Sequence, residues 1–255
     1  MSMCADCFRG VRHEGEPEGK IEQIGGIECY VATPSVDYAK DKVILFLTDA
    51  FGIPLINNRE APHVQLLADD FARNGFKTII PDLFNGDPID AAAFESPGFD
   101  FLPWVAKHPP IATSAIVEKV VKVLTESGVT RIGTTSYCFG AQAAFYLARA
   151  NISRVTVLSH PSALDVPADL ESYHAKSKAP LLINSCEVDP QFGPDRQAVA
   201  DEIFGSGKFA PGYQRTYWEG CVHGFAVRGD LSDPKVKAGK EGSFKATVEF
   251  FAKYL

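Results

Sequence analysis

The alternation of strand-like and helix-like segments constrains the fold of this chain more than any other feature. Short apolar runs such as "VILFLT", which are typical of strands buried on both faces, alternate with longer segments of helical periodicity. The predicted strands are 27–33, 43–48, 77–83, 131–136, 154–159, 180–185 and 213–218. The predicted helices are 61–74, 113–127, 141–150, 194–204 and a last one from 232. The pattern indicates an α/β protein with a mostly parallel sheet flanked by helices on both faces.

Composition and length are consistent with one large core. The chain has 255 residues, of which 45 % are apolar and 22 % charged. It has no internal repeat, low-complexity tract or obvious linker, so we expect a single domain over 1–255. The segment 1–26 precedes the first predicted strand and is expected to be a leader that packs on the domain. The segment 85–111 is rich in proline and aromatic residues and is predicted to be irregular.

The charge of the chain argues against nucleic acid and membrane partners. The net charge is −7, and the Lys and Arg residues are scattered rather than gathered into a basic stripe. No apolar run approaches the roughly 20 residues that span a bilayer, and the first residues lack a signal-peptide core. We therefore expect a soluble, cytoplasmic protein, a monomer or homodimer, whose partner is a small molecule.

The six cysteines predict neither a disulfide framework nor a metal site. They are too sparse for a disulfide-rich secreted domain, so reduced thiols are expected. Cys4 and Cys7 form a C-x-x-C with His13 nearby, but a structural zinc site needs four ligands. We expect no metal there and no cofactor elsewhere.

Cys138 is the candidate nucleophile. It follows the strand 131–136 and precedes a helix, which is the setting of a nucleophile elbow. In "SYCFGA", Gly140 provides the small neighbour that a sharp turn needs, although Ser136 stands where glycine is usual. The N-terminus of the following helix favours a thiolate. A buried, unreactive cysteine is the alternative when Cys138 is considered alone.

Asp189 and His223 complete a possible catalytic triad. Asp189 follows the strand 180–185, and His223 follows the strand 213–218. The order nucleophile, acid, histidine is that of the α/β-hydrolase fold, and parallel strands bring such ends to one edge of the sheet. A histidine would move the thiol proton while the acid orients its ring. His160 remains an alternative histidine, and Glu187 and Asp195 are alternative acids.

Several motifs together resemble the dienelactone hydrolase family. They are "SYCFGA", "EVDPQFGP", "VHGFAVRGD", "LTDAFGI" and "TIIPDLFNGDP", and the resemblance runs from about Ile27 to Leu255. It implies an α/β-hydrolase fold without a large cap domain, a triad of Cys138, His223 and Asp189, no metal, and hydrolysis of lactones or small esters. It also implies an oxyanion hole made by the backbone N–H groups of Ala50 and Phe139.

The sequence departs from the family pattern in ways that bear on the substrate. Ser136 and Ala141 replace two glycines of the elbow, and Asp49 stands where bacterial members have a glutamate implicated in activating the thiol. Arg228 matches one of the two arginines that bind a substrate carboxylate in those members. The second is missing, and Lys107 or His108 could replace it. The residues predicted to bind substrate are Asp49, Phe51, Trp104, His160 and Arg228.

Three classes of function stay open at this point. The first is a cysteine-dependent hydrolase of lactones or small esters, and the aromatic residues of 94–104 suggest a larger, flatter apolar substrate for it. The second is an isomerase or cyclase of polyketide or other secondary metabolism that uses the same triad. The third is a small-molecule binder that has kept the fold without catalysis.

Overall fold

The protein is described by a computed structural model that covers residues 9–12, 14–53, 63–94 and 96–255. Cys4, Cys7 and His13 lie outside these residues. Eight strands form one sheet in the order β1-β2-β4-β3-β5-β6-β7-β8, antiparallel at β1 and β2 and parallel from β4 onward. The strands are β1 (Lys20–Ile24), β2 (Ile27–Ala32), β3 (Lys42–Leu47), β4 (Thr78–Pro81), β5 (Arg131–Tyr137), β6 (Ser153–Ser159), β7 (Leu181–Val188) and β8 (Tyr213–Val222).

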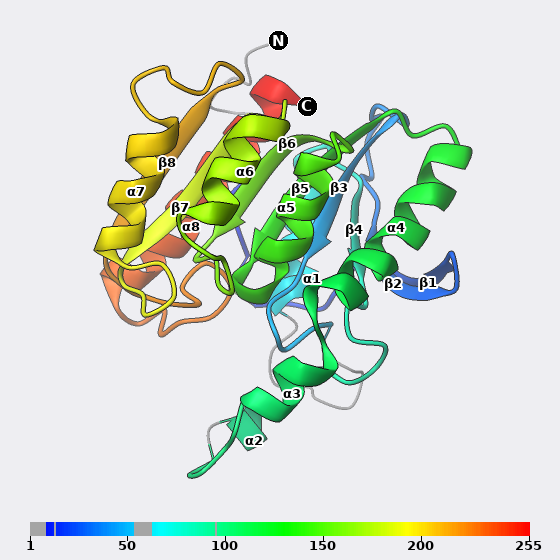
Figure 1. Ribbon diagram of the computed structural model, residues 1–255. Helices are drawn as coiled ribbons and strands as arrows, with labels where there is room; N and C mark the ends of the chain where they lie inside the picture. Colours follow the sequence, from blue (N-terminus) through cyan, green and yellow to red (C-terminus); the bar gives the residue numbers. More distant parts are fainter. Residues whose placement is uncertain (1–8, 13, 54–62, 95) are drawn as a thin grey trace.

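Helices cover both faces of the sheet (Figure 1). Helices α1 and α8 pack on one face. Helices α4 and α5 pack on the other face, where α6 and α7 extend the same layer. The helices are α1 (His63–Arg73), α2 (Ala91–Phe94), α3 (Leu102–Lys107), α4 (Pro110–Glu126), α5 (Ala141–Arg149), α6 (Ala168–Lys176), α7 (Pro194–Phe204) and α8 (Pro234–Tyr254). The predicted mostly parallel α/β architecture is confirmed.

Strand β3 shows why the central strands read as unbroken apolar runs. Successive side chains of a strand point to opposite faces. Val43, Leu45 and Leu47 enter the core under α4 and α5, whereas Ile44 and Phe46 enter the core under α1 and α8. All five are at most 1 % exposed. Both faces of the strand need apolar residues, so the alternating pattern of a half-exposed strand is absent.

The structure differs from the sequence prediction where elements bury little apolar surface. Strand β1 was not predicted, because "KIEQI" is almost wholly exposed at the edge of the sheet. Helix α6 was not predicted either, because only Leu170 and Tyr173 of its residues are buried. The segment 85–111, predicted irregular, contains α2 and α3 and the start of α4. Two of these helices begin with a proline in the first turn, where its missing N–H is not needed.

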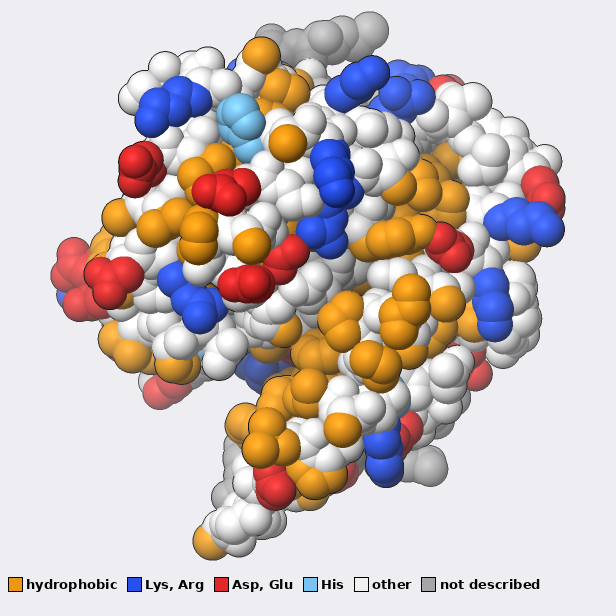
Figure 2. Space-filling view, in the orientation of Figure 1, with side chains coloured by type: hydrophobic (Ala, Val, Ile, Leu, Met, Phe, Trp, Pro, Cys, Tyr) orange, Lys and Arg blue, Asp and Glu red, His pale blue; other side chains and the backbone are white. Residues whose placement is uncertain are grey.

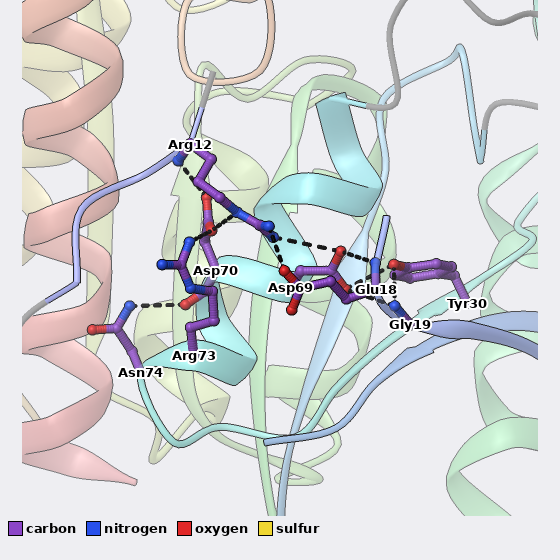
Figure 3. Close-up of polar contacts among 8 residues, drawn as sticks. All are labelled: Arg12, Glu18, Gly19, Tyr30, Asp69, Asp70, Arg73 and Asn74. Carbon is purple, nitrogen blue, oxygen red and sulfur yellow. Dashed lines mark hydrogen bonds and ion pairs between the residues drawn. The ribbon is translucent and has the colours of Figure 1, made fainter. Parts of the chain in front are cut away.

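The N-terminal segment is anchored to α1 by buried carboxylates (Figure 3). Arg12 donates from its backbone N–H and from its Nε to the two carboxylate oxygens of Asp70, at 2.6 and 2.8 Å. Asp69 accepts from the backbone N–H of Glu18 and from the hydroxyl of Tyr30. The side chains of Asp69 and Asp70 are 2 % and 0 % exposed, so Arg12 provides a positive charge for carboxylates that have lost most contact with water.

The helices that the structure describes contain no candidate membrane span. In those residues, no helix combines the length and the apolar character that crossing a bilayer requires.

Candidate active site

The three residues of the predicted triad follow neighbouring parallel strands. Cys138 comes directly after β5, Asp189 after β7 and His223 after β8. Strands β5 to β8 lie side by side in that order, so their carboxyl ends share one edge of the sheet. Ligands of open α/β sheets bind at this edge.

Cys138 has the strained backbone of a nucleophile elbow. Its φ is +48°, a left-handed value that side chains other than glycine, asparagine and aspartate seldom adopt. Gly140 allows the turn to pack against β3, since a Cβ there would lie 2.5 Å from the backbone oxygen of Leu47. Such strain is concentrated at functional sites.

The two lost glycines of the elbow are compatible with this geometry. Ser136 lies within β5, is fully buried and has its Oγ 3.5 Å from the carbonyl oxygen of Val157. Ala141 has φ −59° and begins α5, where any residue fits. The positive φ is at Cys138 itself, so neither Ser136 nor Ala141 has to be glycine for backbone reasons.

Asp189 and His223 form a direct pair. The imidazole Nδ1 lies 2.8 Å from the Asp189 Oδ1, and the two side chains are 19 % and 1 % exposed for His223 and Asp189. The same oxygen accepts the backbone N–H groups of Gln191 and Phe192 at 2.8 and 3.0 Å, which fixes the carboxylate on its own turn. The alternative acids lie elsewhere: Glu187 accepts from the backbone N–H of Gly220, and Asp195 is in the first turn of α7.

The surroundings of His223 favour its charged form. Burial opposes protonation, but hydrogen bonds to Asp189 and Cys138 and the negative charges of these two groups outweigh it and raise the pKa of His223 to about 10. The imidazole therefore connects the carboxylate with the sulfur.

His160 lies against this pair and stays neutral. Its ring centroid is 5.0 Å from that of His223, in an edge-to-face arrangement, and the residue is completely buried. Burial, together with the positive charges of His223 and Arg228, lowers the pKa of His160 well below its usual value. The structure thus places His160 beside His223 and gives it no exposed surface on which substrate could bind.

Asp49 and Arg228 form a second buried pair next to the proposed oxyanion hole. The Arg228 Nη1 donates to the Asp49 carboxylate, whose other oxygen accepts the backbone N–H of Phe51 at 3.0 Å. The guanidinium carbon also lies 4.2 Å from the centroid of the Phe51 ring. The Asp49 side chain is 1 % exposed and that of Arg228 is 36 % exposed. Asp230, two residues after Arg228, accepts hydrogen bonds from Ser232.

The two predicted oxyanion donors belong to turns next to the sulfur. Phe139 is in the short 3₁₀ turn Cys138–Gly140 that begins at the nucleophile, and the first N–H groups of a helical turn have no partner within it. Ala50 follows β3, which pairs with β5 in parallel. Its turn is closed by Gly52, with φ +62°, whose N–H donates to the carbonyl of Asp49 at 3.1 Å. Such N–H groups can stabilise a developing oxyanion.

An aromatic wall adjoins the oxyanion side. Trp104 packs against Phe84 and Phe139, donates its indole N–H to the carbonyl of Asp87 and is only 8 % exposed, so it lies mainly inside the wall. Phe51 contacts Phe94 edge to face, and Phe94 is 48 % exposed. Helices α2 and α3 project from the body, and hydrophobic side chains gather over this projection (Figure 2).

The two residues considered as substitutes for a second arginine both lie near the carboxylate of Asp87. The His108 Nε2 lies 3.1 Å from the Asp87 carboxylate, and the Lys107 Nζ lies 3.9 Å from it. Both are thus neighbours of a carboxylate of the chain itself.

Ser162 lies next to the sulfur and was missed by the sequence analysis. Its Oγ is 3.4 Å from the Cys138 Sγ, and its backbone N–H donates to the carbonyl of Cys138 at 3.1 Å. A signal existed, because Ser162 comes three residues after the end of β6, at the same sheet edge as the triad.

Two other features of the described residues lie away from this chemistry. A shallow hollow of about 690 Å³ between α6 and α7 is lined by residues such as His174 and Ile203 and contains none of the site residues. No group of three or more His, Cys, Asp or Glu side chains within the described part of the chain is arranged to hold a metal ion. The absence of a metal at Cys4 and Cys7 stays a prediction, since those residues lie outside that part.

Comparison with known proteins finds relatives that match this chain over nearly its whole length. The chain is 34 % identical to Hydrolase pyvD of Aspergillus violaceofuscus over 98 % of this chain and 96 % of that protein. It is 31 % identical to Dienlactone hydrolase 1 of Gibberella moniliformis over 96 % and 91 %, respectively.

The structural comparison confirms the predicted α/β-hydrolase fold. A putative dienelactone hydrolase from Klebsiella pneumoniae superimposes with a TM-score of 0.69 and 18 % identity, covering 89 % of this chain and 93 % of that one. In the described part of this chain, the insertion between β4 and α4 contains only the two short helices α2 and α3, and no large cap is evident. The sequence matches the dienelactone hydrolase family over residues 27–255. The chain therefore belongs to the dienelactone hydrolase family.

Proposed function

We propose that this chain hydrolyses lactones or small carboxylic esters, with Cys138 as nucleophile, His223 as general acid and base, and Asp189 as the group that orients His223. The observation that carries the proposal is the strained elbow at Cys138, φ +48°, facing an imidazole that binds Asp189 through Nδ1 at 2.8 Å. Family membership, and relatives named as hydrolases and dienlactone hydrolases, support the same reaction class.

The proposed reaction has two halves. The Cys138 thiolate attacks the carbonyl carbon, the carbonyl oxygen becomes an oxyanion held by the N–H groups of Phe139 and Ala50, and the ester C–O bond breaks as His223 gives its proton to the departing oxygen. Water then attacks the thioester carbon and loses a proton to the neutral His223. The C–S bond breaks, the thiolate returns, and the product acid leaves. A lactone gives one hydroxy acid, and an ester gives an acid and an alcohol.

The Asp49–Arg228 pair supports an uncharged substrate. The guanidinium already has a buried carboxylate as partner, and its face lies over Phe51. A substrate carboxylate would compete with Asp49 for the same cation. The neighbouring aromatic residues Phe51 and Phe94 offer flat apolar surface instead. We therefore propose neutral lactones or aryl esters as the better substrate class.

The test is turnover by Cys138 variants on a panel of unsaturated lactones and aryl esters. Cys138→Ala should lower kcat by several powers of ten, as losses of a triad nucleophile do. Iodoacetamide should inactivate the wild type in proportion to alkylation of the Cys138 peptide. Substantial activity in Cys138→Ala, or inactivation with Cys138 unmodified, would contradict the proposed nucleophile.

Product analysis separates hydrolysis from isomerisation or cyclisation on the same triad. In water enriched in heavy oxygen, hydrolysis places one heavy atom in the product carboxylate, because water attacks the thioester. An isomerase or cyclase returns a product of unchanged mass. Turnover without incorporation would therefore overturn the hydrolytic half of the proposal and keep Cys138 as a nucleophile.

A further inference from the structure

Two contacts of Ser162 hold the loop after β6 against Cys138. The Ser162 N–H donates to the carbonyl of Cys138 at 3.1 Å, and the Ser162 Oγ lies 3.4 Å from the Cys138 Sγ. The His160 N–H binds the carbonyl of Asn184 at 2.9 Å, so the loop is also tied to β7. Ser162 is 7 % exposed, which keeps its hydroxyl near the sulfur and largely away from bulk water.

The loop holds this position at a backbone cost. His160 has φ +39° and Ala163 has φ +57°, so a left-handed residue lies on each side of Ser162. Neither is glycine, so each residue holds a sterically strained backbone conformation. An unstrained turn would meet the need to connect β6 with α6. The strain is consistent with a requirement to hold Ser162, which lies between these two residues, in a fixed position.

The charge state of the sulfur decides which atom donates. A thiolate has no hydrogen and can only accept, whereas a serine hydroxyl can do both. In the proposed reaction, the form of the sulfur that attacks the substrate and later leaves the thioester is the thiolate. The hydroxyl of Ser162 is then the donor.

We propose that Ser162 is a further catalytic residue, whose hydroxyl donates a hydrogen bond to the Cys138 thiolate. The inference rests on the proposed nucleophile. It gives the thiolate two donors from different loops, His223 after β8 and Ser162 after β6. Charge-assisted hydrogen bonds of this kind are stronger than neutral ones, so the contact lowers the energy of the thiolate more than that of the thiol or the thioester.

The hydrogen bond from Ser162 affects both acylation and deacylation, because the charge on the sulfur changes in each. During acylation the sulfur loses its charge as the C–S bond forms, so the hydroxyl releases a ground-state contact. During deacylation the C–S bond breaks and the electron pair returns to sulfur as a negative charge, which the hydroxyl meets with its hydrogen. The second half therefore gains most, because the hydrogen bond strengthens toward the leaving thiolate.

The first experiment measures thiol ionisation without relying on turnover. The rate of Cys138 alkylation by iodoacetamide is followed against pH in the full-length protein, with the modified peptide quantified by mass spectrometry. Ser162→Ala should raise the midpoint of this profile by about one pH unit, the shift expected on losing a modest hydrogen bond to the charged form. Buried Cys29 and Cys186, whose thiol pKa values burial raises to about 12, provide slow internal references.

Two further variants separate the hydroxyl from general packing. Ser162→Thr and Ser162→Val differ mainly in the hydroxyl, so Thr should titrate near the wild type and Val near Ser162→Ala, which keeps the test available if the Ala variant folds poorly. Ser177→Ala is the matched control. Ser177 is 6 % exposed, its Oγ accepts a hydrogen bond from the Ala179 N–H, and it precedes β7 at the other end of the sheet. It should leave the profile unchanged.

The second experiment tests the catalytic role with an activated aryl ester. In Ser162→Ala, rapid mixing should show an acylation burst with deacylation slowed roughly tenfold, so kcat falls more than kcat/KM.

The other ionisable groups around the sulfur, which the substitution must leave unchanged, are His223, Asp189, His160 and the Asp49–Arg228 pair. An unshifted alkylation midpoint, or an unchanged deacylation rate, would overturn the role of Ser162. Full turnover in Cys138→Ala would instead overturn the nucleophile on which it rests.

Discussion

Two buried carboxylates flank the nucleophile in nearly the same local setting. Asp189 follows β7 and Asp49 follows β3, and each side chain is 1 % exposed. Each accepts a backbone N–H from two residues further on, Gln191 for Asp189 and Phe51 for Asp49. Each also binds a basic side chain from the loop after β8.

The two pairs differ in whether the basic partner can lose its proton. His223 exchanges its proton within the accessible pH range, whereas a guanidinium stays charged in proteins. In the proposed mechanism the Asp189 pair therefore relays a proton to substrate, while the Asp49 pair holds the loop and the Phe51 ring in place. A carboxylate at a strand end becomes part of a catalytic relay through the chemistry of its partner.

The largest expected effect separates the two carboxylates directly. Asp189→Asn should lower kcat by about 10³-fold or more, because the amide favours the wrong histidine tautomer and removes the charge that stabilises the imidazolium. Asp49→Asn should cost no more than about tenfold, since no proton passes through that pair. Steady-state kinetics on one aryl ester would measure both. Equal losses would mean that Asp49 also takes part in activating the thiol.

A smaller effect concerns the substrate side of the Asp49 pair. Arg228→Met should lower kcat/KM for a carboxylated lactone and for its neutral ester analogue to a similar degree, because the guanidinium is already occupied by Asp49. A charge-assisted contact to substrate would add about 1.5–3 kcal/mol, a difference of roughly tenfold or more between the two substrates. A selective loss of that size on the carboxylated lactone would place Arg228 in the binding site.

The smallest effect is the pH dependence of stability that His223 confers. Its pKa in the folded protein is raised above the ordinary value of about 6.5, so its contribution is fully present below pH 6.5 and is lost as the pH rises toward about 10. The Cys138→Ser variant lacks the thiol whose contact helps to raise the pKa of His223, so in that variant the contribution of His223 is lost at a lower pH. The free energy of unfolding of Cys138→Ser minus that of Cys138→Ser/His223→Gln, measured by urea denaturation, should fall by on the order of 1 kcal/mol between pH 6.5 and 9. A difference that stays constant with pH would show that Asp189 does not hold a proton on His223.

Much of the fold was readable from the sequence because its central elements bury surface on both sides. The unbroken apolar run at 43–48 fits neither a half-exposed strand nor a surface helix, so its assignment was nearly forced. The edge strand Lys20–Ile24 has no such pattern, since it is ordered by pairing with β2 rather than by burial. Helices α2 and α3 are too short for periodicity to show.

The candidate site was readable only where chemistry and strand ends coincide. Cys138, Asp189 and His223 could be found because each stands at the end of a predicted strand, and the structure brings all three together. The binding of Arg228 to Asp49, 179 residues apart in the sequence, depends on how two loops meet, which no local pattern encodes. Ser162 was hidden for a similar reason, because a single serine after a strand carries no signal until its distance to the sulfur is known.

The anchoring of Arg12 bears on where the folded unit begins. The match to the family starts at residue 27, yet Arg12 contacts Asp70 across 58 positions of sequence, and β1 is paired along its length with β2. A shortened chain starting at the family border would lose the Arg12 contacts to Asp69 and Asp70 and leave Arg73 as the ion-pair partner of Asp70. The family match begins at residue 27, whereas the contacts of the folded unit begin at Arg12 or earlier, at least fifteen residues before it. A shortened chain should therefore keep Arg12.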